Sequence, residues 1–140
     1  MKVYKQTGRI LIICDDETKA KRIELSLGNQ FDSQIIESGR KGINCIKKDF
    51  ISIAFLPLDL VDMDFFDFIR FSKRISPDTM FIIINGPSLP DLSFLVASHQ
   101  IDGFVSEPLS VSKVLMIKQT VNKKKVEIEG KFDGSLALTK

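Results

Sequence analysis

The stretch Arg9-Ile-Leu-Ile-Ile-Cys-Asp-Asp-Glu17 is a short apolar run that ends in two adjacent aspartates. Apolar residues occupy every position of the run rather than every second one, which is typical of a strand that helices cover on both faces. We therefore predict that residues 10–14 form a buried strand of a parallel sheet. Asp15 and Asp16 lie where that strand ends.

Similar apolar runs recur along the chain and alternate with segments of helical periodicity. This alternation predicts an α/β fold in which a parallel sheet lies between two layers of helices, a three-layer sandwich. Gly28 stands where a residue of positive φ ends the first helix. The remaining strands are predicted at residues 33–37, 51–56, 80–84 and 103–106, and the helices at 18–27, 42–48, 63–75, 91–99 and 111–122.

Composition and charge exclude several classes of protein. The chain has 140 residues, of which 44% are hydrophobic, so one domain of ordinary size is expected. A net charge of +2 gives no general attraction to nucleic acid or to an anionic membrane, and we expect neither as a partner. Without a bilayer-length apolar stretch or a signal peptide, the sequence predicts a cytoplasmic protein. Cys14 and Cys45 are interpreted as small buried hydrophobes.

Ligands of open parallel sheets bind at the carboxyl ends of the strands, so the residues that follow each strand are candidate site residues. Adjacent carboxylates suit Mg²⁺, which one or two carboxylates and water usually hold. A second interpretation is that Asp15 caps the helix beginning near residue 18, with Asp16 and Glu17 favouring its positive end. Both interpretations stay open. The candidates at this edge are Asp15, Asp16, Pro57, Asn85 and Glu107.

Five stretches of the chain have, in this order, the pattern of one known family: residues 10–17, 37–43, 61–70, 76–84 and 102–109. They resemble the response-regulator receiver domain of two-component systems. The resemblance extends from Arg9 to about Val121 and implies a flavodoxin-like (CheY-like) fold with sheet order 2-1-3-4-5 and about five helices. It also implies a role in phosphorelay signal transduction.

The departures from the family all fall on its chemistry. Pro57 takes the position of the phosphoaccepting aspartate, and Asn85 replaces the hydroxyl residue that contacts the phosphoryl group. Glu107 replaces a lysine, whereas Phe104 keeps the aromatic switch position. Phosphoryl transfer to a carboxylate depends on a metal ion and on cationic and hydrogen-bonding groups that stabilise the transferred charge. The resemblance therefore implies a degenerate receiver, or pseudo-receiver.

We accordingly expect a signalling module that acts through protein–protein interaction, is not an enzyme and is not phosphorylated. No cofactor is required, and Mg²⁺ at Asp15 and Asp16, with Glu107 as an added ligand, is expected to bind weakly. The expected partner is a signalling protein or an attached output domain, and a homodimer stays open. Residues 1–125 form the predicted receiver-like domain. Residues 126–140 are a tail, or a linker toward a further domain.

A second hypothesis is an active receiver that accepts a phosphoryl group on Asp59 with Mg²⁺ at Asp15 and Asp16. It requires a loop two residues shorter than usual after the third strand, whereas the stretch from Pro57 to Met80 matches the family without a gap. A separate alternative concerns the helix at 63–75, whose phenylalanines exceed the needs of one core stripe. Either the exposed ones form a partner surface, or all pack inward or against neighbouring loops: Phe65, Phe66, Phe68 and Phe71.

Overall fold

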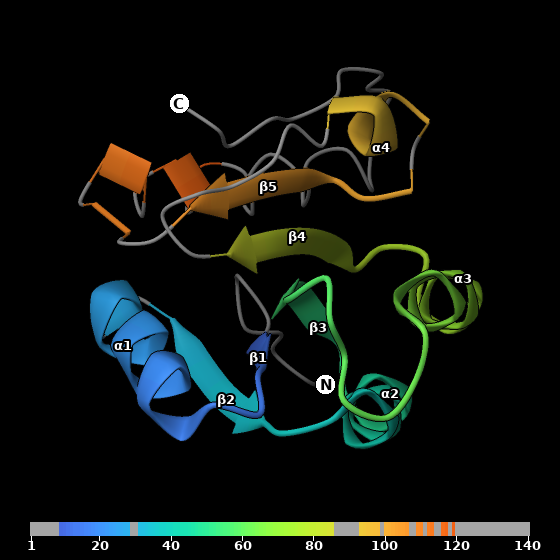
Figure 1. Cartoon of the computed structure of the whole chain (residues 1–140), viewed down its shortest axis with the longest axis horizontal. Coiled ribbons are helices and arrows are strands. Elements are labelled where there is room, and N and C mark those ends of the chain that lie inside the picture. Colours follow the sequence, from blue (N-terminus) through green and yellow to red (C-terminus); the bar gives the residue numbers. More distant parts are fainter. Residues whose placement is uncertain are drawn as a thin grey trace, which may run out of the picture.

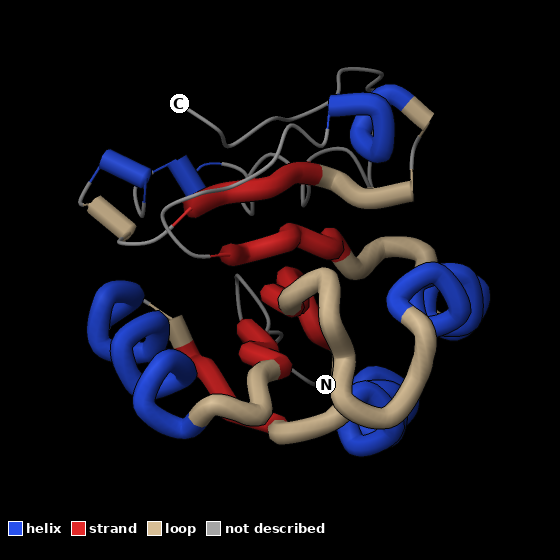
Figure 2. Tube along the Cα trace, in the orientation of Figure 1, coloured by secondary structure: helices blue, strands red, loops and turns tan. Residues whose placement is uncertain are grey.

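The computed structural model of the chain describes residues 9–28, 31–85, 93–98, 100–106, 109–110, 112–113, 116–117 and 119. Within these residues, five strands and four helices alternate along the chain. The sheet runs through the middle of the molecule and helices lie on both of its sides (Figure 1). Figure 2 shows the same arrangement by type of secondary structure. This is the predicted three-layer α/β sandwich.

All neighbouring strands are parallel, and their order in the sheet is β2-β1-β3-β4-β5. The order confirms the expectation taken from the resemblance. Strands β3 and β5 have the bounds that the sequence predicts, β1 and β2 begin and end one residue earlier than predicted, and β4 ends one residue later. The strands are β1 (Arg9–Ile13), β2 (Asp32–Ile36), β3 (Ile51–Leu56), β4 (Met80–Asn85) and β5 (Gly103–Ser106).

The continuous apolar runs build two cores, one on each face of the sheet. Side chains of a strand alternate between faces, so Ile12 and Phe55 belong to one core and Ile13 and Leu56 to the other. Helix α1 (Glu17–Leu27) covers the first face. The second face is covered by α2 (Gly39–Lys48), α3 (Phe65–Ile75) and α4 (Ser93–Ala97).

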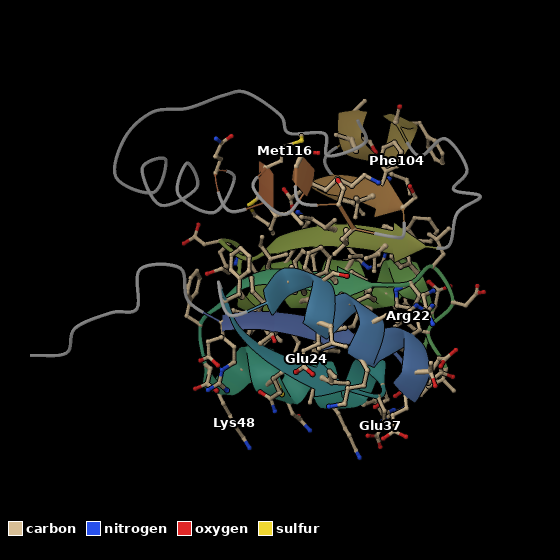
Figure 3. All side chains as sticks on the ribbon, turned by 90° about the vertical axis from the view of Figure 1, so that its left-hand side faces the viewer. Arg22, Glu24, Glu37, Lys48, Phe104 and Met116 are labelled. Carbon is tan, nitrogen blue, oxygen red and sulfur yellow. The ribbon has the colours of Figure 1, made fainter. Side chains whose placement is uncertain are left out.

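Helix α1 carries the predicted stop signal. Gly28 has a φ of 67°, a conformation that residues with a Cβ rarely adopt, and its N–H donates to the Glu24 carbonyl. Ala20, Ile23 and Leu27 form the buried stripe. Figure 3 views the molecule from the side of this helix and labels Arg22 and Glu24 on it.

Helix α2 begins at Gly39, three residues before the predicted start. Ser38 is the N-cap, and its Oγ accepts the Lys41 N–H at 3.3 Å. Glycine has a low helix propensity, so Gly39 and Gly42 favour a later start of the helix. In the structure both glycines lie in close packing contacts instead. A Cβ on Gly42 would lie 2.8 Å from Ile13 Cδ1, so the missing side chain lets α2 approach β1 closely.

Helix α3 begins at Phe65 rather than at the predicted residue 63. Asp64 is its N-cap, because one carboxylate oxygen accepts the N–H groups of Phe66 and Asp67 at 3.0 and 3.1 Å. The cap places Met63 in the preceding loop, outside the helix.

The C-terminal third of the chain is described in part. Helix α4 spans Ser93–Ala97 of the predicted 91–99, and residues 91, 92 and 99 lie outside the described residues. The tail at 126–140 and the domain boundary at 125 also lie outside them. No helix of the described part is long and apolar enough to cross a membrane. Helical conformation is described within the last predicted helix for Ser112, Lys113, Met116, Ile117 and Gln119.

Candidate functional site

The carboxyl ends of the central strands meet at one edge of the sheet. In the register of the sheet, Ile12 pairs with Phe55, Leu56 with Ile83, and Asn85 with Ser106. Asp15 and Pro57 therefore follow two neighbouring strands, and Asn85 ends the next strand, at the same edge of the sheet. Glu107 lies outside the described residues, and for Asn85 only the backbone is described.

Asp15 and Asp16 are both exposed at the end of β1, but they differ in their contacts. Asp16 is the N-cap of α1 and accepts the Lys19 N–H at 3.2 Å, so the capping residue is Asp16 rather than the Asp15 of the sequence interpretation. Asp15 makes no hydrogen bond or ion pair with any residue that the structure describes. Over the same residues, no group of three or more acidic, histidine or cysteine side chains is placed to hold a metal ion.

Cys14 precedes this acidic pair and is buried. Burial raises the pKa of its thiol and outweighs the lowering effect of the hydrogen bond to Asp16 and of Lys19. The thiol is therefore protonated at neutral pH and is a poor nucleophile. The interpretation as a buried hydrophobe is confirmed for Cys14, whereas Cys45 is only half-buried.

Pro57 directly follows the fully buried strand β3 and is itself half-buried. Its ring carries neither a nucleophilic group nor a backbone N–H. Asp59 lies two residues further along the loop and is exposed. The first position after β3 thus offers no acceptor, and the nearest carboxylate in the loop is that of Asp59.

Phe104 is buried in the core between the sheet and the helices on the α3 side. It pairs in register with Ile83 of β4, and Ile101 and Leu95 belong to the same core. Figure 3 labels Phe104 at strand β5. The ring in the aromatic switch position is therefore a packing element in this structure.

Lys113 is a cation at this edge that the sequence analysis did not single out. Its ammonium group donates to the Ser106 carbonyl at 3.0 Å and lies 3.4 Å from Ser106 Oγ. Ser106 is the last residue of β5 and pairs with Asn85. Lys113, from the helical segment that follows the strand, thus brings a positive charge to the end of β5. It contacts Ser106, the residue that directly precedes Glu107 in the sequence.

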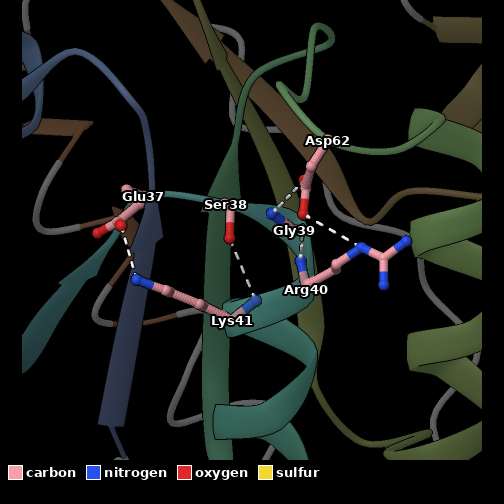
Figure 4. Close-up of polar contacts among 6 residues, drawn as sticks. All are labelled: Glu37, Ser38, Gly39, Arg40, Lys41 and Asp62. Atoms are coloured by element: carbon pink, nitrogen blue, oxygen red, sulfur yellow. Dashed lines mark hydrogen bonds and ion pairs between the residues drawn. The ribbon is translucent and has the colours of Figure 1, made fainter.

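Asp62 is a second residue that sequence reasoning missed, and it links two elements (Figure 4). Its two carboxylate oxygens accept the N–H groups of Gly39 and Arg40 at 2.9 and 3.1 Å, at the beginning of α2. The Arg40 Nε lies 3.8 Å from the same carboxylate. The loop between β3 and α3 is therefore held against α2. The signal for this contact in the sequence is Gly39, which follows the N-cap Ser38 and has no side chain to keep another element away.

The pKa of Asp62 reflects these contacts. Burial raises the pKa, but the N–H groups of Arg40 and Gly39 and the charge of Arg40 outweigh burial and hold it below the ordinary value of 3.8. Gly39 permits the contact, because a Cβ there would lie 2.9 Å from the Met63 side chain and 3.2 Å from Asp62 Oδ1.

The phenylalanines of α3 divide between two environments. Phe65 and Phe68 are buried, whereas Phe66 and Phe71 are each 43% exposed. Phe65 and Phe68 therefore pack inward, whereas Phe66 and Phe71 are covered only in part. Two aromatic side chains remain on the outer side of the helix, where the other alternative places a partner surface.

The comparisons with known proteins agree with this geometry. No protein-family model matches the chain, and no curated protein matches it. Many solved structures do match. One is a CheY-like response regulator receiver domain protein from Methanospirillum hungatei JF-1, at 21% identity and a TM-score of 0.72, covering 85% of this chain and 97% of that chain.

Two further matches differ in what their names describe. A structure named adenylate cyclase, from Rhodopirellula baltica, has 25% identity and a TM-score of 0.70, covering 89% of this chain and 98% of that one. The beryllofluoride-activated NtrC4 receiver domain dimer has 24% identity and a TM-score of 0.69, covering 83% and 97%. Together with the sheet order, these likenesses show that the chain has the fold of the response-regulator receiver domain.

Proposed function

We propose that this protein is a receiver-type signalling module that acts by binding another protein and is not switched by aspartyl phosphorylation. The observation that carries the proposal is Pro57, which occupies the first position after the buried strand β3, at the carboxyl edge of the sheet. A proline there cannot accept a phosphoryl group. Fold alone does not fix function, so the proposal rests on this site and on the family resemblance.

The residues around Pro57 favour the same interpretation. The sequence has Glu107 where the family has a lysine, and a carboxylate repels a phosphoryl group whereas a lysine attracts it. The Asp16 carboxylate already accepts the Lys19 N–H as the N-cap of α1. Of the two aspartates, Asp15 has no partner among the described residues and is the carboxylate left to bind Mg²⁺. With one such ligand we expect a dissociation constant on the order of millimolar.

The proposal has a consequence for signalling. A ligand shifts a conformational equilibrium only if it binds the two states with different affinity. With no phosphoryl group at position 57, nothing at that position biases Phe104 between an inward and an outward arrangement. The protein then presents one constitutive binding surface, and regulation lies in the partner or in an attached domain. No catalytic role is proposed for the module, nor does it need a cofactor.

The alternative is phosphorylation of Asp59. Two observations keep it testable: the carboxylate is exposed in the loop after β3, and the ammonium group of Lys113 supplies a cation at the end of β5. Lys113 is engaged by Ser106, however, and Asp59 follows Pro57 by two residues rather than taking its place.

Intact-mass spectrometry after incubation with acetyl phosphate and Mg²⁺ separates the two. We expect the mass to stay unchanged for the wild-type protein and for Asp59→Asn. One phosphoryl adduct that forms on the wild-type protein and is lost in Asp59→Asn would establish the alternative and refute the proposal. An adduct that persists in Asp59→Asn would also refute the proposal, because another residue would then accept the phosphoryl group.

A further inference from the structure

Helices α2 and α3 lie next to each other on the same face of the sheet (Figure 1). Residues of both helices line a groove on the protein surface. The residues of α3 that line it recur at the spacing of one helical stripe, and those of α2 do the same. The groove has a volume of about 600 Å³. Its lining residues are Arg40, Ile43 and Asn44 from α2, Asp67, Arg70, Phe71 and Arg74 from α3, and Met63 from the preceding loop.

The floor of the groove is apolar. Ile43 is buried and Met63 is half-buried, whereas Phe71 remains 43% exposed. Phe66, also 43% exposed, precedes this stripe on the same helix. Partly exposed aromatic and aliphatic side chains in a concave surface favour the burial of apolar side chains from a ligand.

The walls of the groove are basic. Arg40, Arg70 and Arg74 line it, and Asp67 is the one carboxylate among the lining residues. The surrounding helices extend this charge: α2 contains four basic residues and no acidic residue, and α3 contains three basic residues and Asp67. Because the whole chain has a net charge of only +2, these two helices are more basic than the rest of the chain.

Not all of these cations are neutralised by the protein itself. Arg40 is near Asp62, and Arg70 pairs with Asp67. Arg74 makes no ion pair or hydrogen bond with any residue in the part of the chain that the structure describes. Arg70 and Arg74 are one helical turn apart, so their guanidinium groups can each take a carboxylate from successive turns of a bound helix.

From this juxtaposition we propose that the groove between α2 and α3 docks an acidic, amphipathic helical segment of a partner protein. The apolar side of that segment packs on Ile43 and Phe71, and its carboxylates pair with Arg70 and Arg74. The inference rests on the proposed function, since it names the surface and the partner chemistry of the same binding module. Charge complementarity selects an acidic protein segment over a basic or a purely apolar one.

Two designed peptides test the proposal directly. Both are helical and share one apolar face, but one carries glutamate and the other lysine on the polar face. Each is titrated into the ¹⁵N-labelled full chain without a phosphodonor. The glutamate peptide should shift the amides of residues 40–44 and 63–74 saturably, and the lysine peptide should not.

Variants then locate the contacts. Arg74→Glu should weaken binding of the glutamate peptide by at least about tenfold, because a favourable pair becomes a repulsion. Phe71→Ser should weaken it by a similar factor through the apolar floor. Lys21→Glu on α1 changes the net charge by the same amount on the opposite face of the sheet and should leave the affinity unchanged.

Several outcomes would overturn the inference. They are equal binding of both peptides, shifts centred on α1, and no shifts at millimolar peptide. Self-association that Arg74→Glu abolishes would assign the groove to a second copy of the chain, and binding to anionic phospholipid vesicles that the same variant abolishes would assign it to a membrane. Intact mass after acetyl phosphate treatment of the same samples keeps the two proposals separate, because an adduct refutes only the proposed function and failed peptide binding only the groove.

Discussion

Removal of the Asp62 carboxylate should destabilise the protein, although Asp62 lies in a loop. Its two oxygens accept the N–H groups of Gly39 and Arg40. These N–H groups belong to the first turn of α2 and have no acceptor within the helix. Its side chain is 25% exposed, so solvent weakens the two charge-assisted bonds only in part. Loss of both in Asp62→Ala should cost about 1–2 kcal/mol of unfolding free energy, in the range of strong helix caps. For a domain of this size that corresponds to a melting temperature lower by about 5 °C.

The same variant has a defined pH dependence. The pKa of Asp62 is lowered in the folded state, so its stabilisation is fully present above the ordinary value of 3.8 and is lost as the pH falls through the folded-state pKa. The difference between wild type and Asp62→Ala should therefore be constant near neutral pH and shrink below about pH 4. Asp62→Asn keeps one acceptor and should cost about half as much at neutral pH.

Urea unfolding followed by circular dichroism at several pH values measures these differences. Asp59→Ala is the matched control, because Asp59 is an exposed carboxylate of the same loop without a hydrogen bond or ion pair to a described residue. It should change the unfolding free energy by less than about 0.5 kcal/mol. An Asp62→Ala variant as stable as this control, or a difference that persists undiminished well below pH 3, would refute the reasoning.

Three further changes test the local structure by thermal or urea unfolding. Gly42→Ala should destabilise by about 1–3 kcal/mol despite the better helix propensity of alanine, because the new Cβ would lie 2.8 Å from Ile13 Cδ1; equal or greater stability would contradict the close packing of α2 on β1. Gly28→Ala should cost about 1 kcal/mol, since its φ of 67° strains any side chain, and an unchanged midpoint would argue against this helix end. Asp16→Ala should cost about 1 kcal/mol whereas Asp16→Asn, which still caps α1, should cost little; equal losses in both variants would show that the charge and not the cap matters.

The fold was largely predictable from the sequence because the central strands β1 and β3 are buried on both faces. Strand β3 is fully buried and is followed directly by Pro57, so the end of its apolar run coincides with the end of the strand. Gly28 marked the end of α1 because only a positive φ fits there. The starts of α2 and α3 were less predictable, since Ser38 and Asp64 act through hydrogen bonds that periodicity does not record.

The site was predictable in place but not in detail. The order of the strands fixes which residues reach the carboxyl edge, so Asp15 and Pro57 were found from the sequence. Which of the two aspartates caps α1 depends on where the helix begins. A difference of one residue in that start is more than helix propensity can resolve. Asp62 and Lys113 act across elements, over separations in sequence that only the folded chain brings into contact.

The central claim is that position 57 cannot operate a switch, and beryllofluoride tests it most directly. Beryllofluoride mimics a phosphoryl group and needs the acceptor carboxylate, so with Mg²⁺ it should leave the amide resonances of Asn85 and Phe104 unchanged. The ¹⁵N–¹H spectrum of the full chain, recorded with and without stoichiometric beryllofluoride, is the measurement. Amide shifts that spread from Asn85 through β5 to Phe104 would show a working switch and contradict the account.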